Sequence, residues 1–374
     1  MTGTPDLETY SLKSAAAAEI PAPDLPYEPP MPKDKSAGIG LIGAGGISGA
    51  HLEAYRSAGF NLRVICSPTL GNAIKRRDVY FPDAEATDDV AGTIARTDID
   101  VVDLTPHALE RQPLIETALR AGKHVLSQKP FVLDLDDGAR LVDLAESRGL
   151  VLAVNQNGRF APHLSWIREA VRARLVGEVH SCHTSIHWDH GWTAGTPFEA
   201  IDDLNLYDYA VHWFDFLTSI IGGRANMVFA TTTRAAGQKA RPSLLAEALV
   251  GFDGGQSALV FDGATRFGAE HRTVVTGSAG MVIARGPDPS TQEVTLTTKA
   301  GLSRPQLEGT WVKEGFMGTM GAVLQAIETG TPPLNDARGN LEALALVFAA
   351  IASSHCSEPI VPGTIRSLSA AQRR

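Results

Sequence analysis

The sequence predicts an α/β protein with a doubly wound parallel sheet in its first half and a mainly antiparallel open sheet in its second half. Two observations lead to this prediction. Between residues 37 and 155, short apolar runs alternate with segments of helical periodicity, as in βαβ units. After residue 222, apolar and polar residues alternate in short runs separated by Gly and Asp, which is typical of antiparallel strands with one covered face.

The first half contains predicted strands joined by predicted helices. Residues 37–43 (AGIGLIG) form the first strand, and residues 51–59 form a helix that ends at a glycine. Further strands are predicted at 61–67, 98–105, 123–129 and 149–155, and further helices at 108–122 and 134–149. Strands separated by helices of this length form parallel sheets with right-handed crossovers.

The second half is predicted to be rich in strands. One strand at 177–188 begins the second sheet, and a helical segment follows at 204–217. The later strands are predicted at 225–235, 245–253, 256–263, 271–280, 280–286 and 293–299. Two amphipathic helices, 314–330 and 337–354, are expected to pack beside the sheet or back on the first domain.

The chain is expected to divide into an arm and two domains. A length of 374 residues with 44% hydrophobic content is enough for two cores. Residues 1–35 contain an AAAA run and the proline-rich stretch PAPDLPYEPPMPK, which predicts an arm or linker that is either disordered or lies along a neighbouring subunit. The first domain is placed at 36–157 and the second at 158–374.

Composition argues against several function classes. A formal net charge of -9 disfavours nucleic-acid binding. Cys66, Cys182 and Cys356 are widely spaced, which predicts free thiols in a reducing compartment. The apolar runs fall short of the roughly 20 residues that cross a bilayer, and the N-terminus does not resemble a secretion signal. We therefore expect a cytoplasmic protein without a membrane segment.

The stretch GLIGAGGISGAH, residues 40–51, indicates a phosphate site at the end of the first strand. Gly43 and Gly45 occupy the first two positions of a G-x-G-x-x-G pattern, where one glycine allows a tight turn and the other lets a pyrophosphate approach the backbone. Ser48 holds the third position, and the helix that begins near it offers N–H groups to phosphate. A plain structural turn is the alternative. We predict a dinucleotide site lined by Gly43, Gly45, Gly46 and Ile47.

The end of the second predicted strand bears on which dinucleotide binds. An acidic residue there would bind the adenosine ribose of NAD, whereas a small residue with nearby basic side chains accommodates the extra phosphate of NADP. The tip reads CSPT, residues 66–69, and the basic residues 75–77 follow. We favour NADP, with Ser67 and Arg76 as contacts. The alternative is NAD bound without a ribose carboxylate, beside a solvated basic helix face.

Three stretches resemble the glucose-fructose oxidoreductase/inositol dehydrogenase (Gfo/Idh/MocA) family: GLIGAGGISGAHLEAY, DVVDLTPHALERQPLIETALRAGKHVLSQKPF and VNQNGRF. The most specific piece is AGKHVLSQKP, similar to the family's AGKHVxxEKP, although Gln128 stands where glutamate is usual. The resemblance covers most of residues 38–222. It implies a Rossmann domain, a second domain with a large open, mainly antiparallel sheet, and nicotinamide-dependent oxidation or reduction of sugars or cyclitols. It also implies a homo-oligomer formed through that sheet.

Three residues are candidates for proton chemistry. Lys129 lies at a strand end, where a lysine can hydrogen-bond the reacting oxygen or relay a proton. Asp208 and His212 match the family's D-x-x-x-H, and their spacing puts them on one helix face. We expect His212 to donate and accept the proton, and Asp208 to orient substrate hydroxyls or to bias the protonation of the histidine. The alternatives are a surface lysine beside a turn and a helix whose histidine is structural.

Other residues at strand ends are expected to contact the cofactor. Thr105 and Pro106 follow the strand at 98–105, where ligands bind in open α/β sheets. Asn157 matches a position where the family has a polar residue near the nicotinamide. Arg159 follows it, and a structural ion pair is as plausible for Arg159 as a role in the site. The cofactor contacts predicted here are Thr105, Pro106, Gln128 and Asn157.

The segment HSCHTSIHWDHGW, residues 180–192, contains the ligand types that zinc prefers. A strand at 177–188 would place His183 and His187 on one face and His190 on the other, so we predict no metal site. We predict instead that the polar, aromatic end of this segment lines a sugar pocket, where an indole face stacks on C–H groups; its residues are His187, Trp188, Asp189, His190 and Trp192. Plain sheet surface is the alternative.

The sequence therefore predicts an NAD(P)-dependent oxidoreductase that acts on a CH–OH group of a sugar, sugar derivative or cyclitol. One alternative is a non-catalytic or regulatory dinucleotide-binding protein. Another is a sugar–sugar oxidoreductase whose cofactor stays bound, with the N-terminal arm over its adenine.

Overall fold

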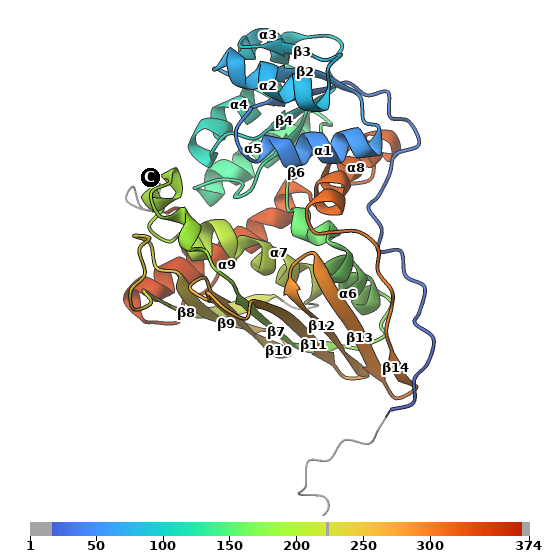
Figure 1. Cartoon of the computed structure of the whole chain (residues 1–374), viewed down its shortest axis with the longest axis vertical. Coiled ribbons are helices and arrows are strands. Elements are labelled where there is room, and N and C mark those ends of the chain that lie inside the picture. The colour runs from blue at the N-terminus through green and yellow to red at the C-terminus, as the bar shows by residue number, and fades with distance from the viewer. Residues whose placement is uncertain (1–16, 222–223, 369–374) are drawn as a thin grey trace, which may run out of the picture.

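The computed structural model describes residues 17–221 and 224–368, which form two sheets with helices between them (Figure 1). The six-stranded sheet of the first half has the order β3-β2-β1-β4-β5-β6. The eight-stranded sheet of the second half has the order β14-β13-β12-β11-β7-β10-β9-β8. Both halves of the predicted fold class are confirmed.

The first sheet is parallel throughout. Its strands are β1 (Ile39–Ile42), β2 (Leu62–Cys66), β3 (Glu85–Thr87), β4 (Val101–Leu104), β5 (His124–Ser127) and β6 (Leu152–Val154). Its helices are α1 (Ser48–Ala58), α2 (Leu70–Tyr80), α3 (Val90–Ala95), α4 (Ala108–Arg120) and α5 (Leu135–Ser147). Strands β2 and β3 lie on one side of β1, and β4, β5 and β6 lie on the other. The strand order therefore reverses next to β1, and ligands of such sheets bind at the loop after this strand.

One strand and two helices of the first domain, β3, α2 and α3, were not predicted. Of the eleven residues of α2, only Ala73 is buried, so the helix carries no apolar stripe that a periodicity argument could detect. Strand β3 is a three-residue edge strand with no fully buried residue. Their formation depends on packing against β2 rather than on local pattern.

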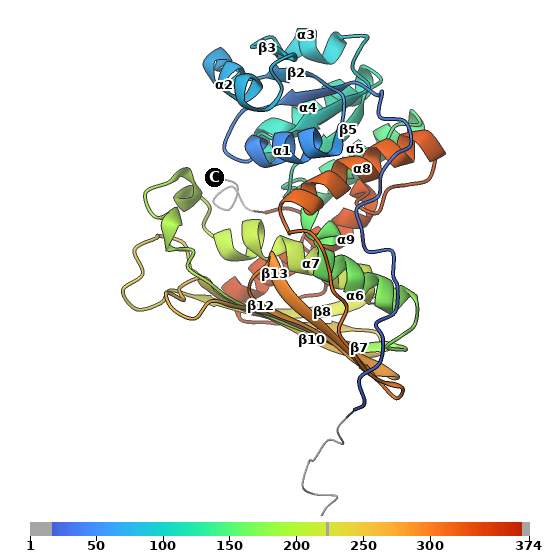
Figure 2. The same cartoon turned by 45° about the vertical axis from the view of Figure 1, so that its right-hand side comes forward.

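The second sheet is mixed. Strands β10 and β7 pair in parallel, and all other strand pairs of this sheet are antiparallel. Its strands are β7 (Val179–His187), β8 (Ala225–Thr233), β9 (Leu245–Phe252), β10 (Gly255–Asp262), β11 (Glu270–Gly277), β12 (Gly280–Asp288), β13 (Thr291–Thr298) and β14 (Gly301–Ser303). Helices α6 (Pro162–Arg172), α7 (Val211–Ile220) and α9 (Ala337–Cys356) lie on one face, between this sheet and the first domain (Figures 1 and 2). The other face points away from the rest of the chain. The short helices are η2 (Asn157–Phe160), η3 (Gly191–Thr193), η4 (Pro197–Ala200) and η5 (Asn205–Tyr209).

Helix α8 (Lys313–Thr329) joins the second half of the chain to the first domain. It packs along α1 (Figure 1). Phe316, Met320 and Val323 of this helix belong to the same buried cluster as Leu41 of β1 and Leu52 of α1. The first domain is therefore completed by a helix that lies about 160 residues beyond it in the sequence.

Helix α9 is long and apolar enough to cross a membrane by length and composition. Its position explains this composition, because it packs against β8, α7 and α5. About 56% of its most apolar window is buried inside the protein. We therefore assign α9 to the core of the second domain.

The described part of the N-terminal arm, residues 17–35, runs along its own chain (Figure 2). It pairs with β14, where the N–H of Ile20 donates to the carbonyl of Leu302 at 2.9 Å. It then follows α8, and the N–H of Lys33 donates to Glu328 at 3.2 Å. Lys35 Nζ finally donates to the carbonyl of Ala58, at the end of α1. The first 16 residues of the predicted arm lie outside the described residues.

A buried chain of hydrogen bonds crosses the parallel sheet and reaches the backbone of Lys129. The N–H of Lys129 donates to Gln128 Oε1 at 3.0 Å, and Asn155 Nδ2 donates to the same oxygen at 2.8 Å. Asn155 Nδ2 also lies 3.1 Å from His51 Nε2, and His51 Nδ1 lies 2.7 Å from Asp103 Oδ2. The chain thus links α1, β4 and the loops after β5 and β6.

The direction of each bond follows from the first one. A backbone N–H is always a donor, so the Gln128 atom that faces it is the carbonyl oxygen. Asn155 then donates to that oxygen with its amide nitrogen, and this nitrogen makes His51 Nε2 an acceptor. His51 carries its proton on Nδ1 and donates it to Asp103, whose Oδ2 also accepts from Tyr55 Oη at 2.7 Å. The carboxylate is buried in the sheet but receives two donors.

We expect the substitution Asn155→Leu to lower the free energy of unfolding by about 1–3 kcal/mol, because it leaves His51 Nε2 buried without a donor. Urea unfolding followed by circular dichroism measures the change. Asn72→Leu is the control, since Asn72 is exposed on α2, and it should change the same free energy by no more than about 0.5 kcal/mol. Equal effects of the two substitutions would contradict a structural role for the chain.

Candidate active site

Lys129 and Asp208 form an ion pair between the two domains. Lys129 Nζ lies 3.1 Å from Asp208 Oδ1 and donates to the Asp208 backbone carbonyl at 2.8 Å. Their side chains are 17% and 22% exposed, so the pair is accessible yet partly desolvated. Lys129 follows β5 of the first domain, whereas Asp208 lies in η5 of the second. The structure thus brings together two of the three residues predicted as candidates for proton chemistry.

The predicted single helix at 204–217 is two elements in the structure. Residues Asn205–Tyr209 form one π-helical turn, and α7 starts at Val211. The N–H of Ala210 donates to the carbonyl of Asn205 at 2.8 Å, which closes the wider turn. Such turns occur often at functional sites, and here the turn contains Asp208.

His212 is half-buried next to this pair. Burial lowers the pKa of its imidazole well below the usual value, and the Lys129 ammonium adds to the shift. His212 is therefore neutral near pH 7 and able to accept a proton. Its Nδ1 is buried and has no hydrogen-bond partner among the described residues, and its ring meets Trp311 edge-on at 5.6 Å. Asp208 was expected to bias the protonation of His212 directly. In the structure Asp208 pairs with Lys129, so it acts on the imidazole through the lysine.

Arg111 holds the two loops that flank the site. Its guanidinium donates to the carbonyl of Pro106 at 2.5 Å and to the carbonyl of Pro130. Burial lowers the pKa of Arg111 to about 10. The Pro106 carbonyl, expected to contact the cofactor, is thus already bonded within the protein. Arg111 was not predicted, and its only sequence signal is a basic residue in the first turns of an otherwise amphipathic helix.

The glycine loop after β1 forms an open cradle. Gly43 has φ +105°, and a Cβ there would lie 2.3 Å from Thr105 Oγ1, so only glycine fits. A Cβ at Gly45 or Gly46 would meet nothing within 4 Å, which leaves the backbone accessible. Ile47 precedes α1, is 41% exposed and places no side-chain cap on the helix. The free N–H groups at this end of α1 suit a pyrophosphate, so the loop fits a dinucleotide.

One of the three basic residues after β2 reaches this loop. Arg76, on α2, donates to the carbonyl of Gly45 at 2.8 Å. Arg77 is turned to Asp78, with which it forms an ion pair at 2.7 Å, and Lys75 is exposed. Ser67 at the tip of β2 is buried and accepts a hydrogen bond from the N–H of Thr69. Ser67 and Arg76 therefore lie near the loop, and the carboxylates of Asp88 and Asp89, which follow β3, are close enough to the strand tip to help raise the pKa of the Cys66 thiol.

The remaining predicted cofactor residues differ in their roles. Thr105 donates to the carbonyl of Gly43 at 2.8 Å and so fixes the glycine loop. Asn157 is buried in η2, below the start of α8. A Cβ added at Gly315 of α8 would lie 3.1 Å from the Cβ of Asn157. Arg159 forms a buried ion pair with Asp215 at 2.6 Å, as the structural alternative predicted.

An aromatic wall lies beside Asp208. Trp188 stacks on Tyr209 at a ring distance of 4.5 Å, and its indole N–H donates to His190 Nδ1 at 2.9 Å. Burial lowers the pKa of His190 to about 4. His190 is one of the residues predicted to line the sugar pocket, and it lies beside Trp188 in the structure.

The structure does not bring His187 to this wall. Cys182, Thr184 and Ile186 alternate on the buried side of β7, so His187 lies on the outer face of the sheet. Its ring bonds Ser185 Oγ at 2.6 Å. The prediction that His187 lines the same pocket as Trp188 therefore fails on strand alternation.

Across residues 17–221 and 224–368, no three His, Cys, Asp or Glu side chains come together as a metal site. The three cysteines are free thiols, as predicted. Cys182 is buried on the inner side of β7, and burial raises the pKa of its thiol to about 12.

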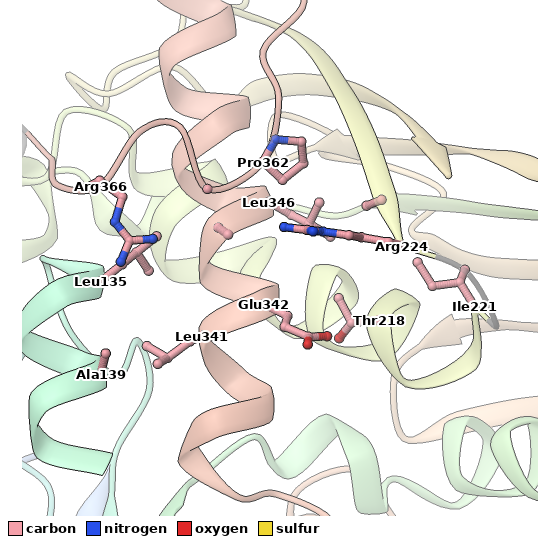
Figure 3. A pocket seen from close by; sticks show the side chains of 13 residues that line it. Leu135, Ala139, Thr218, Ile221, Arg224, Leu341, Glu342, Leu346, Pro362 and Arg366 are labelled. Atoms are coloured by element: carbon pink, nitrogen blue, oxygen red, sulfur yellow. The ribbon is translucent and has the colours of Figure 1, made fainter. Parts of the chain in front are cut away.

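A pocket of about 630 Å³ lies apart from these residues (Figure 3). It opens between α5, α7 and α9, with Arg224, Glu342 and Arg366 on its walls. Arg366 is already paired with Asp136. None of the predicted proton-handling residues lines this pocket, so the Lys129–Asp208 pair remains the candidate active site.

Sequence relatives include sugar and cyclitol dehydrogenases. Inositol 2-dehydrogenase of Rhizobium meliloti (strain 1021) is 27% identical over 332 residues, which cover 84% of this chain and 96% of that enzyme. D-apiose dehydrogenase of Paraburkholderia graminis is 26% identical over 194 residues, or 51% of this chain and 52% of that enzyme.

Solved structures share the fold. An oxidoreductase from Agrobacterium radiobacter, solved in complex with NAD+, L-tartaric acid and magnesium, matches with a TM-score of 0.78 at 21% identity. The match covers 88% of this chain and 99% of that one. At this identity the likeness shows the fold alone.

Family models match both halves of the chain. Residues 37–156 match the model described as the oxidoreductase family with an NAD-binding Rossmann fold. Residues 165–283 match the C-terminal domain of the same family. Together with the open glycine cradle and the lysine at the end of β5, these matches show that the chain belongs to the Gfo/Idh/MocA family of oxidoreductases.

Proposed function

We propose that this protein is an NADP-preferring oxidoreductase that interconverts a CH–OH group and a ketone on a sugar or cyclitol. The observation that carries the proposal is the Lys129–Asp208 ion pair with the neutral His212 beside it, at the strand ends that also bear the glycine loop. The relatives named as inositol 2-dehydrogenase and D-apiose dehydrogenase support the substrate class.

The residues divide the proton chemistry among them. Oxidation of a carbinol requires loss of a hydride and a proton, and the bound nicotinamide accepts the hydride. Lys129 Nζ donates a hydrogen bond to the reacting oxygen and holds the carbon in place, while the neutral His212 accepts the hydroxyl proton. Asp208 balances the charge of Lys129 and orients a further hydroxyl. In the reverse direction His212 returns the proton.

The preference for NADP is supported by the surroundings of the β2 tip. Ser67 places a small hydroxyl where a carboxylate would repel a ribose phosphate. Arg76 already spans from α2 to the glycine loop at 2.8 Å and supplies a positive charge on that side. A guanidinium is well suited to phosphate, because its planar donors can bind two oxygens at once.

The N-terminal arm bears on the alternative in which the cofactor never leaves. Its described bonds go to β14, to α8 and to Ala58 at the C-terminal end of α1. The glycine loop lies at the opposite end of that helix, so this part of the arm supports an exchangeable cofactor. A non-catalytic role is disfavoured by the presence of Lys129 and His212 together, since binding alone uses neither proton-handling group.

We also propose a cytoplasmic homo-oligomer that assembles through the outer face of the eight-stranded sheet. Buried and exposed positions alternate along β9, and Leu249 on its outer side is 52% exposed. Ile283 of β12 and Val274 of β11 are only partly covered on the same face. Partly exposed apolar side chains on a sheet face favour contact with a second copy.

The test of the proposed function is nicotinamide absorbance at 340 nm, with the purified protein, either cofactor, and a panel of sugars, sugar acids, ketosugars and inositols. Reduction of NADP+ by one of these substrates is the expected result. Cofactor binding without turnover on any of them would favour the non-catalytic alternative. Turnover on paired sugars without free reduced cofactor would favour the captive-cofactor alternative.

Lys129→Met should reduce kcat by about 100-fold or more, because it removes both the hydrogen bond to the reacting oxygen and the positive charge. The dissociation constant for the cofactor should change by less than about threefold, since the lysine serves chemistry rather than cofactor binding. Steady-state kinetics and fluorescence titration measure the two quantities. Lys299→Met, an exposed lysine of the second domain, is the control. Equal losses of turnover and cofactor affinity in Lys129→Met would refute the assignment.

Ser67→Asp should raise the KM for NADP+ by about tenfold or more and leave the KM for NAD+ nearly unchanged, because a carboxylate would repel the ribose phosphate. The ratio of kcat/KM for the two cofactors is the readout. Ser57→Asp, at an exposed position of α1, adds the same charge away from the strand tip. An unaltered cofactor ratio in Ser67→Asp would show that the β2 tip does not select the cofactor.

A further inference from the structure

We infer that His190 binds the substrate as a fixed hydrogen-bond donor, with Trp188 holding its proton on Nε2, and that it selects polyols by contacting a second substrate oxygen. This inference rests on the proposed function and adds a substrate-binding residue to the same site. His190 would be a specificity residue, distinct from the proton-accepting His212.

The tautomer of His190 follows from its bond to Trp188. An indole N–H can only donate, so His190 Nδ1, at 2.9 Å from Trp188 Nε1, must be the acceptor. An accepting Nδ1 carries no proton, and the proton of a neutral imidazole then lies on Nε2. The side chain thereby offers a donor at Nε2 and no free acceptor.

The ring is fixed from several sides. The N–H of His190 donates to the carbonyl of Gly263 at 2.8 Å, which sets the backbone after β7. Trp192 and Tyr209 lie 5.2 and 5.0 Å from the ring, and only 6% of the residue is exposed. Within the described part of the chain, Nε2 has no protein partner, so a ligand oxygen is free to accept its proton.

The surrounding charges place the ring at the active site and keep it neutral. Burial lowers the pKa of His190 to about 4, Asp208 and Asp189 act to raise it, and Lys129 acts to lower it. Asp208 and Lys129 are the two members of the ion pair, so His190 lies within their field. Because the pKa lies below the usual value, the imidazole is neutral above about pH 5 and becomes charged only under stronger acid.

The two imidazoles therefore have different capacities. His212 Nδ1 has no partner among the described residues, so its ring can take either tautomer and accept a proton. His190 cannot accept at Nε2, because its other nitrogen is occupied by the indole. A fixed donor favours binding of a substrate that presents a second oxygen, because a substrate without that oxygen leaves the donor unpaired.

The tautomer is tested first by 15N NMR of the full-length protein labelled at histidine, with His190→Gln to assign the signal. We expect the shifts of a protonated Nε2 and an unprotonated Nδ1 from pH 8 down to about pH 5, and a change in the Nε2 shift on addition of myo-inositol with NADP+. In Trp188→Phe the ring should titrate nearer its usual pKa, because the indole donor that disfavours the charged form is lost. Averaged tautomers in the unaltered protein would overturn the inference.

Selectivity is tested by the ratio of kcat/KM for myo-inositol to that for cyclohexanol. His190→Ala should lower this ratio about 10- to 100-fold, and His190→Gln, which keeps a donor, should recover part of it. His180 is an exposed histidine at the start of β7, the strand that precedes His190. His180→Gln should leave the ratio within about twofold. A ratio unchanged by His190→Ala would overturn the selectivity role.

Failure of the proposed function and failure of this inference give different results. A protein that reduces neither cofactor with any polyol would refute the oxidoreductase proposal. The NMR experiment needs no turnover, so the Nε2 signal and its response to myo-inositol would still decide the assignment of His190. A fixed tautomer whose signal ignores myo-inositol would overturn the substrate contact.

Discussion

The buried carboxylate of Asp103 is the constraint on which the site depends. A charge inside a parallel sheet is costly unless donors reach it, and here His51 and Tyr55 of α1 supply them. The bond to Asp103 Oδ2 orients His51, which orients the amide of Asn155 and then Gln128. The last bond of the chain holds the backbone N–H of Lys129. The backbone of Lys129 is therefore linked through hydrogen bonds to a buried carboxylate on β4.

Burial then sets the protonation of the site. Lys129 lies close to Asp208 and acts on the imidazoles of both His212 and His190, so each histidine loses basicity to desolvation and to the same positive charge. Both rings are neutral near pH 7, yet hydrogen bonding separates them. The bond from Trp188 fixes one ring as a donor, whereas the other ring is free to exchange a proton. Two chemically identical side chains thus have different hydrogen-bond surroundings.

The site draws on both domains, and α8 and η5 connect them. Lys129 comes from the parallel sheet, whereas Asp208 and His212 come from the segment that lies on the second sheet. Helix α8 packs on α1 and closes the core of the first domain. Residues that are distant in the sequence thus come into contact in the fold.

The sequence by itself determined the fold class, the glycine loop and the Lys129, Asp208 and His212 group, because these depend on local periodicity and on short motifs. Helix α2 and strand β3 escaped prediction, because they bury too little apolar surface to leave a pattern. Only the tertiary structure separated His187 from His190, which the sequence had placed in one pocket. Strand alternation turned His187 outward, and the loop after β7 turned His190 toward Trp188. Tautomers and buried hydrogen-bond chains depend on contacts between distant segments, and those contacts exist only after the chain has folded.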